Sequence, residues 1–71
     1  MTEIELTEIF EYLDELHAYG TINMSDARSY VVDAFGIDQK AAGWALSAWM
    51  ETWSDEPAAD RAARAAKEGS R

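Results

Sequence analysis

The chain opens with a stretch that predicts a capped amphipathic helix, TEIELTEIFEYLDELHAYG at residues 2–20. Thr2 stands three residues before Glu5, the spacing of a capping box, in which each side chain can satisfy the other residue's backbone amide. Gly20 is placed to end the helix in a left-handed conformation. We therefore predict a helix over residues 3–18, whose apolar stripe repeats every three or four positions at Leu6, Ile9, Phe10, Leu13 and Leu16.

Two further helices are predicted by caps and apolar periodicity. Ser25 is a good N-cap for the second helix, Gly36 closes it, and Asp38 caps a third helix that runs to Trp53. Three amphipathic helices joined by short turns predict an all-α fold, a three-helix bundle. The second stripe is Ala27, Tyr30, Val31, Ala34 and Phe35, and the third is Ala42, Ala45, Leu46, Trp49 and Trp53. The expected core is Leu13, Tyr30, Phe35, Leu46 and Trp49.

Residues 25–53 resemble the helix-turn-helix unit, with Gly36 at the position of its turn glycine. A recognition helix needs side chains that read bases and cations that contact phosphates. The third helix offers only Gln39 and Lys40 for these contacts, against Asp38 and Glu51. We therefore predict a helix-turn-helix-like corner that packs within the bundle, and a DNA-binding regulator remains an alternative.

The composition changes at Ser54, after which the chain reads SDEPAADRAARAAKEGSR. This segment contains alanine but no leucine, isoleucine, valine or aromatic residue, so it is expected to bury little. We divide the chain into an acidic three-helix domain at residues 1–53 and a charge-balanced, alanine-rich tail at residues 54–71. A solvated, disordered tail is the main prediction, and a short helix up to Glu68 is the alternative.

Charge and composition restrict the function. The 71 residues carry a net charge of −8, and residues 1–53 hold ten acidic and two basic residues. Such a surface repels nucleic acid and anionic membranes, which favours a protein partner with a basic surface. There is no cysteine and one histidine, His17, which removes most ligands for zinc and most nucleophilic triads. We predict a protein that is not an enzyme and uses no metal or cofactor, with His17 interacting with the dipole and turn at its helix end.

The N-terminal sequence MTEIELTEIF lacks the basic start and apolar run of a signal peptide. No apolar stretch reaches the roughly 20 residues needed to span a bilayer. These features predict a soluble protein of the cytoplasm.

Two surface features are candidates for binding a partner. Glu8, Glu11 and Glu15 share the face opposite the first apolar stripe, next to Asp14, and predict an acidic ridge. Trp44 lies away from the third stripe, so a three-helix bundle leaves its indole exposed, as is typical of an interface anchor. The residues predicted to join Trp44 in a protein-binding surface are Lys40, Ser47 and Ala48. Three alternatives stay open for this face: a protein partner, a homodimer, or the tail folded back over Trp44.

The motifs YLDEL at 12–16, GTINM at 20–24, AFGIDQKAA at 34–42 and AWMETW at 48–53 together resemble a group of small uncharacterised proteins of tailed bacteriophages. The resemblance covers about residues 9–53, excludes the tail, and carries no assigned activity. It implies a phage gene product in the cytoplasm of a bacterial host. Combined with the charge, it predicts a non-enzymatic accessory protein that binds a host or phage protein and inhibits a defence or transcription component by nucleic-acid mimicry. A small homo-oligomeric structural protein is the main alternative.

Overall fold

The computed structural model describes residues 2–20 and 24–69, and in this part of the chain all regular structure is helical. The described residues form four helices: α1 (Glu3–Tyr19), α2 (Met24–Phe35), α3 (Gln39–Glu51) and α4 (Ala58–Gly69). The predicted all-α class is confirmed. The three-helix bundle is incomplete as a description, because a fourth helix follows it in the segment expected to be a solvated tail.

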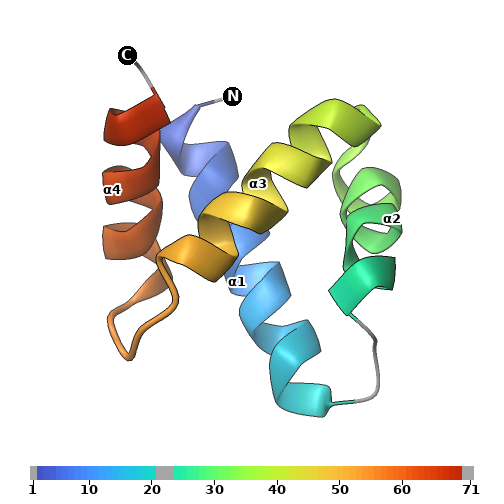
Figure 1. Ribbon diagram of the computed structural model, residues 1–71, viewed down its shortest axis with the longest axis horizontal. Coiled ribbons are helices and arrows are strands. Elements are labelled where there is room, and N and C mark those ends of the chain that lie inside the picture. Colours follow the sequence, from blue (N-terminus) through green and yellow to red (C-terminus); the bar gives the residue numbers. More distant parts are fainter. Residues whose placement is uncertain (1, 21–23, 70–71) are drawn as a thin grey trace.

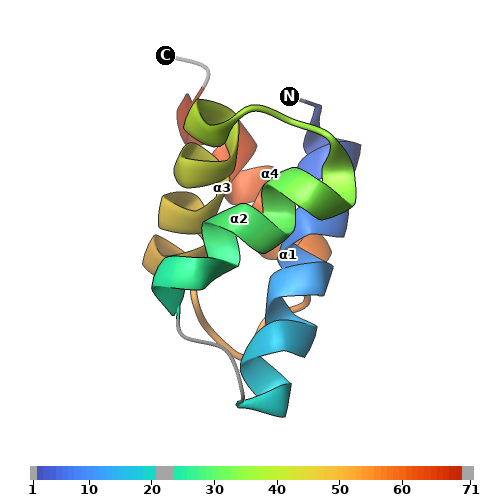
Figure 2. The same ribbon diagram turned by 90° about the vertical axis from the view of Figure 1, so that its right-hand side faces the viewer.

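Helix α1 is the centre of the arrangement and packs against each of the other three helices. Helix α3 crosses α1, while α2 and α4 lie on opposite sides of this pair (Figures 1 and 2). The α4 helix packs mainly on α1, which is distant from it in sequence, and less on α3, which precedes it. The first and last helices of the described chain therefore lie side by side.

The ends of α1 confirm the predicted signals. The Thr2 hydroxyl accepts a hydrogen bond from the Glu5 backbone amide at 3.1 Å. Gly20 follows the helix with φ 67°, in the left-handed region that only glycine adopts without strain. The predicted stripe is buried at Leu6, Ile9, Phe10 and Leu13, and Leu16 is partly buried against it.

The corner between α2 and α3 also follows the sequence signals. Gly36 has φ 65°, and its amide donates to the Val32 carbonyl at 2.9 Å. The Asp38 carboxylate then caps α3 by accepting from the Ala41 amide at 2.7 Å. Helix α2 begins at Met24, so Ser25 lies inside it and is not the predicted N-cap. The predicted turn before α2 includes residues 21–23, which lie outside the described part of the chain.

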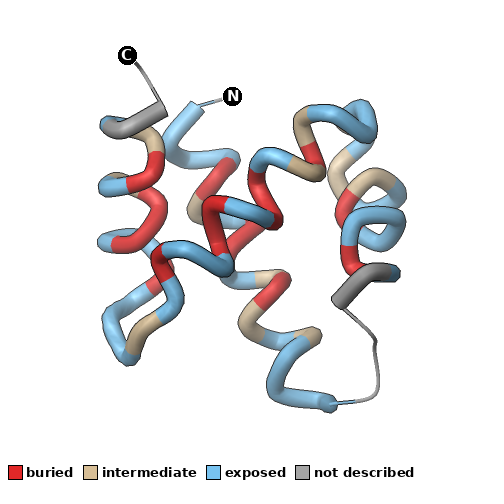
Figure 3. Tube along the Cα trace, viewed as in Figure 1, coloured by how far each residue is buried: buried red, intermediate tan, exposed pale blue. Residues whose placement is uncertain are grey.

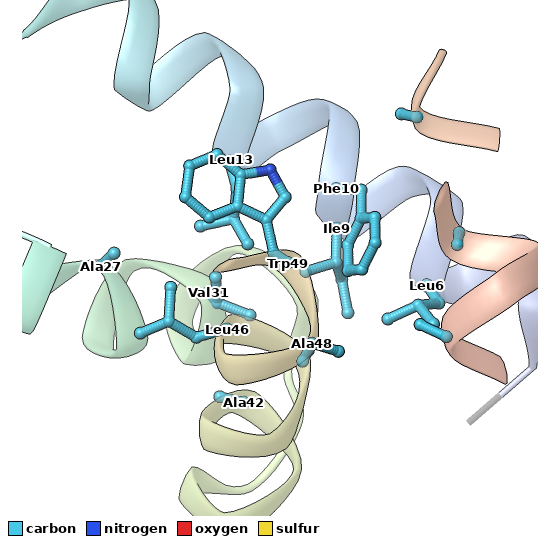
Figure 4. Close-up of a cluster of buried hydrophobic side chains, with 14 residues drawn as sticks. Leu6, Ile9, Phe10, Leu13, Ala27, Val31, Ala42, Leu46, Ala48 and Trp49 are labelled. Carbon is cyan, nitrogen blue, oxygen red and sulfur yellow. The ribbon is translucent and has the colours of Figure 1, made fainter. Parts of the chain in front are cut away.

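The core lies where the helices meet (Figures 3 and 4). Leu13, Leu46 and Trp49 are buried as predicted, and Phe35 is partly buried with its ring edge-on to Tyr12. Tyr30 was predicted in the core but is 45% exposed. Among residues 26–35 of α2, Ala27 and Val31 are fully buried and lie one turn apart, and Tyr30 points about 100° away from Val31.

Two other residues of the predicted stripes, Ala34 and Trp53, are exposed rather than buried. Ala34 is exposed, because α2 covers the core with only a narrow face. Trp53 is about half-exposed because α3 ends at Glu51, and the non-helical backbone of Thr52 (φ −100°, ψ 7°) removes Trp53 from the helical stripe. Its indole still packs against Trp49 of that stripe, and also lies beside His17 and Arg61.

The main prediction of a solvated tail is wrong and its alternative, a short helix, is confirmed, because α4 is helical and contributes buried residues to the core. The helix begins directly after Pro57, whose carbonyl accepts from the amides of Asp60 and Arg61 at 3.1 and 3.2 Å. Its buried alanines, spaced by one turn, allow the backbone to approach the large side chains of α1, and Leu6 and Phe10 lie on the side of α1 toward α4 (Figure 4). Among residues 58–67 of α4, the buried ones are Ala58, Arg61, Ala62 and Ala65.

Gly43 in α3 lies against the guanidinium of Arg28 from α2, and an added Cβ would stand 2.9 Å from the Arg28 Nη2. The obstacle is the end of a long side chain that can rotate away, whereas alanine gains about 1 kcal/mol of helix propensity over glycine. We expect Gly43→Ala to raise the free energy of unfolding by up to about 1 kcal/mol. Chemical denaturation followed by circular dichroism checks this. Destabilisation would mean that the Arg28 position is fixed by the packing of α2 on α3.

Candidate protein-binding surface

The acidic ridge, defined as Glu8, Glu11 and Glu15, forms the outer face of α1. All three side chains are exposed, and they lie opposite the residues of α1 that enter the core. Within residues 2–20 and 24–69, none of these carboxylates takes part in an ion pair. Their mutual repulsion is therefore not offset by a neighbouring cation in the described part of the chain.

Asp14 was predicted to join this ridge, but its carboxylate is engaged inside the protein. The indole Nε1 of Trp49 donates to Asp14 Oδ1 at 2.9 Å, and the Arg61 Nη2 donates to Asp14 Oδ2 at 2.6 Å. The Arg61 side chain is 3% exposed and the Asp14 side chain 32% exposed. Asp14 therefore links α1, α3 and α4, and we remove it from the partner-binding surface.

The Trp44 face, defined as Lys40, Trp44 and Ser47, is exposed on the outer side of α3, and Trp44 itself is 42% exposed. Ala48 was predicted to belong to this face but is 8% exposed and part of the core. It lies on the flank of α3 toward Leu6 and Phe10 (Figure 4), where the fourth helix also packs. Because α4 packs mainly on α1 and Trp44 remains exposed, the tail does not bury this indole.

The acidic ridge and the Trp44 face point in different directions. Trp49 reaches α1 through its bond to Asp14, and Trp44 is about 140° around α3 from Trp49, so it points away from α1. The ridge occupies the side of α1 that is opposite its buried stripe. Since α1 and α3 form separate layers (Figure 2), one flat partner surface cannot contact both features at once.

An aromatic group that the sequence reasoning missed lies at the C-terminal ends of α1 and α3. The ring centroid of His17 is 4.8 Å from that of Trp53 and 5.8 Å from that of Trp49, and the two indoles are 5.0 Å apart. The Arg61 guanidinium carbon lies 5.4 Å from the Trp53 centroid and 5.9 Å from that of Phe10. His17 is in the last turn of α1, as expected, but it packs on indole rings. The four-residue spacing of Trp49 and Trp53 was the sequence signal that could have predicted this aromatic group.

The turn before α4 carries an exposed ion pair. The Arg64 Nη2 donates to both carboxylate oxygens of Glu56, at 2.6 and 2.7 Å. This hydrogen bond and the charge of Arg64 hold the pKa of the Glu56 carboxyl below its ordinary value. The Ser54 hydroxyl also accepts from the Glu56 amide at 3.2 Å, which shapes the turn that leads into α4.

The described residues contain no group of three or more His, Cys, Asp or Glu side chains placed to hold a metal ion. In the same ranges, no helix is both long and apolar enough to cross a membrane. A shallow hollow on the outer face of α2 is lined by Asp26, Ser29, Tyr30 and Asp33, all from that single helix. Comparison with protein-family models, curated proteins and solved structures gives no match.

Proposed function

We propose that this protein is a non-enzymatic binding protein whose acidic ridge docks on a basic surface of another protein. The observation that carries the proposal is the set of three exposed carboxylates of Glu8, Glu11 and Glu15, which have no ion-pair partner in the described part of the chain. A stable surface helix normally mixes charges of both signs at this spacing. A partner's lysines and arginines would supply the missing cations and speed the encounter.

The ridge has the form of a row. Glu8 and Glu15 are seven positions apart, so the carboxylates extend over about 10 Å of the helix axis. Together with the net charge of −8, this row supports docking in a basic groove that otherwise holds nucleic acid. The resemblance of residues 9–53 to tailed-phage proteins supports a phage accessory protein in a bacterial host, with a defence or transcription component as its target.

The test compares two triple variants with the same total charge. Reversing Glu8, Glu11 and Glu15 to lysine changes the net charge from −8 to −2, and reversing the exposed Asp26, Asp33 and Asp55 does the same elsewhere. Partners are captured from bacterial lysate with and without competing nucleic acid. Their association rates are then measured at several ionic strengths.

We expect the ridge variant to associate at least about tenfold more slowly at low salt and to lose most of its salt dependence. The control variant should retain most of the wild-type rate. Equal losses in both would show that net charge alone governs binding. Wild-type rates in both would show that the acidity serves solubility.

A homodimer through the Trp44 face is a second candidate, favoured by the 42% exposure of Trp44 on the outer side of α3. Such a contact is apolar, so its affinity would change little with salt, unlike a complex formed by the ridge. Sedimentation of the wild-type and Trp44→Ala proteins over a range of concentrations separates the two. A dimer that is lost on Trp44→Ala supports this candidate, and a monomer at all concentrations excludes it.

A further inference from the structure

The surroundings of Arg61 in α4 resemble a binding site for an arginine side chain. Its Nη2 donates to Asp14 at 2.6 Å, its Nε donates to the Glu56 carbonyl at 3.0 Å, and its guanidinium lies near the rings of Phe10 and Trp53. A carboxylate combined with aromatic rings is a chemistry that selects guanidinium. The carboxylate and one ring belong to α1, so α1 supplies much of an arginine-binding site that α4 fills.

Apart from Arg61, residues 58–67 of α4 place only alanine side chains in the core. These alanines are Ala58, Ala62 and Ala65, and alanine removes far less apolar area from water than the leucines and phenylalanine of α1. The Nη1 of Arg61 is buried and has no acceptor within the described residues. A buried donor without a partner opposes docking. Terminal helices that bury little apolar area open before the rest of a domain does.

We propose that α4 is a displaceable intramolecular ligand, and that the face of α1 beneath it binds an arginine-bearing helix supplied by another protein chain. The face is lined by Leu6, Phe10 and Asp14, with Trp53 at its edge. This face fits a helix with the pattern of α4, which has a small residue three positions before the arginine and small residues one and four positions after it. The small residues let the helix approach α1 closely, and the arginine fixes its register through Asp14. This surface is separate from the acidic ridge.

Hydrogen exchange in the full-length wild-type protein tests whether α4 opens separately. We expect the amides of Ala62 and Ala65 to exchange at least about tenfold faster than those of Phe10 and Leu13, because opening α4 leaves the α1–α3 contacts intact. Equal protection of the four amides would show that α4 opens only when the whole domain unfolds. That result would overturn the proposal.

Binding in trans tests the surface itself. The probe is a fluorescent peptide of residues 54–71, titrated into the full-length wild-type and Arg61→Ala proteins. We expect at least about tenfold tighter binding to the Arg61→Ala protein, whose own α4 competes less. Peptides carrying Arg61→Ala or Arg64→Ala have the same charge, and the Arg61→Ala peptide should bind at least about tenfold more weakly than the Arg64→Ala peptide.

Equal binding of the two substituted peptides would show attraction by charge alone and overturn the proposal. The absence of binding to a folded Arg61→Ala protein would also overturn it. Circular dichroism establishes whether that variant is folded. If that variant is unfolded, the wild-type protein is titrated with the wild-type, Arg61→Ala and Arg64→Ala peptides. The proposal then requires that the Arg61→Ala peptide bind at least about tenfold more weakly than the Arg64→Ala peptide.

Discussion

Replacing Phe10 by alanine should lower the free energy of unfolding by about 3–5 kcal/mol. The ring is fully buried at the point where α1 meets α4, and it also lies beside the Arg61 guanidinium. Truncation leaves a cavity that the surrounding helices cannot fill without moving. Because a domain of this size has only about 3–5 kcal/mol of stability in total, most of the variant should be unfolded at 25 °C. Urea denaturation followed by far-ultraviolet circular dichroism measures the change.

Tyr30→Ala is the matched aromatic control for this substitution. The sequence predicted both residues on inward stripes, but Tyr30 is 45% exposed. Its loss should cost less than about 1 kcal/mol, as for a surface position. A cost below about 1 kcal/mol for Phe10→Ala as well would contradict the position of α4 on α1.

Much of the fold was predictable from the sequence because its signals are local. The Thr2 cap, Gly20 and the apolar repeat of α1 act within a few residues of one another, and so do Gly36 and Asp38 at the corner. These interactions need no knowledge of the rest of the chain. Burial was predicted wrongly at Tyr30 and Ala34, because it depends on how wide a face of α2 the neighbouring helices cover.

The fourth helix was only the alternative prediction for the tail, because its stability comes from a distant segment. A face of Ala58, Ala62 and Ala65 buries too little to indicate a core helix on its own. It becomes buried because the large side chains of α1 fill the space between the backbones. The available signal was the spacing of these alanines together with Arg61 on the same side.

The candidate site shows the same difference between local and long-range effects. Exposure of Glu8, Glu11, Glu15, Lys40, Trp44 and Ser47 follows from helix periodicity and is found in the structure. Asp14 is partly buried and bound by Arg61 of α4, and Ala48 is buried on the flank where α4 packs, so neither occupies the position predicted for it. Whether any of these residues binds a partner stays a prediction. Because the tail was mainly predicted to be solvated, the contacts of α4 with Asp14 and near Ala48 were missed, and both residues were assigned to the binding surface.

Replacing Asp14 by alanine should lower the free energy of unfolding by about 2–4 kcal/mol, the second largest effect expected in this chain. The substitution leaves the Arg61 guanidinium buried without its counter-charge and removes the acceptor of the Trp49 indole. The Asp14 side chain is about one-third exposed, so water reduces the loss relative to a fully buried pair. Thermal and urea denaturation measure this change.

Two comparisons assign the cost of Asp14→Ala to its cause. Glu15→Ala removes the neighbouring carboxylate, which is exposed on the acidic ridge, and should change stability by less than about 0.5 kcal/mol. The double variant Asp14→Leu with Arg61→Met should recover much of the loss, because exchanging a buried ion pair for apolar side chains is often neutral or stabilising. If Asp14→Ala cost no more than Glu15→Ala, then neither the Arg61 pair nor the Trp49 bond would contribute to holding α4 against α1 in solution.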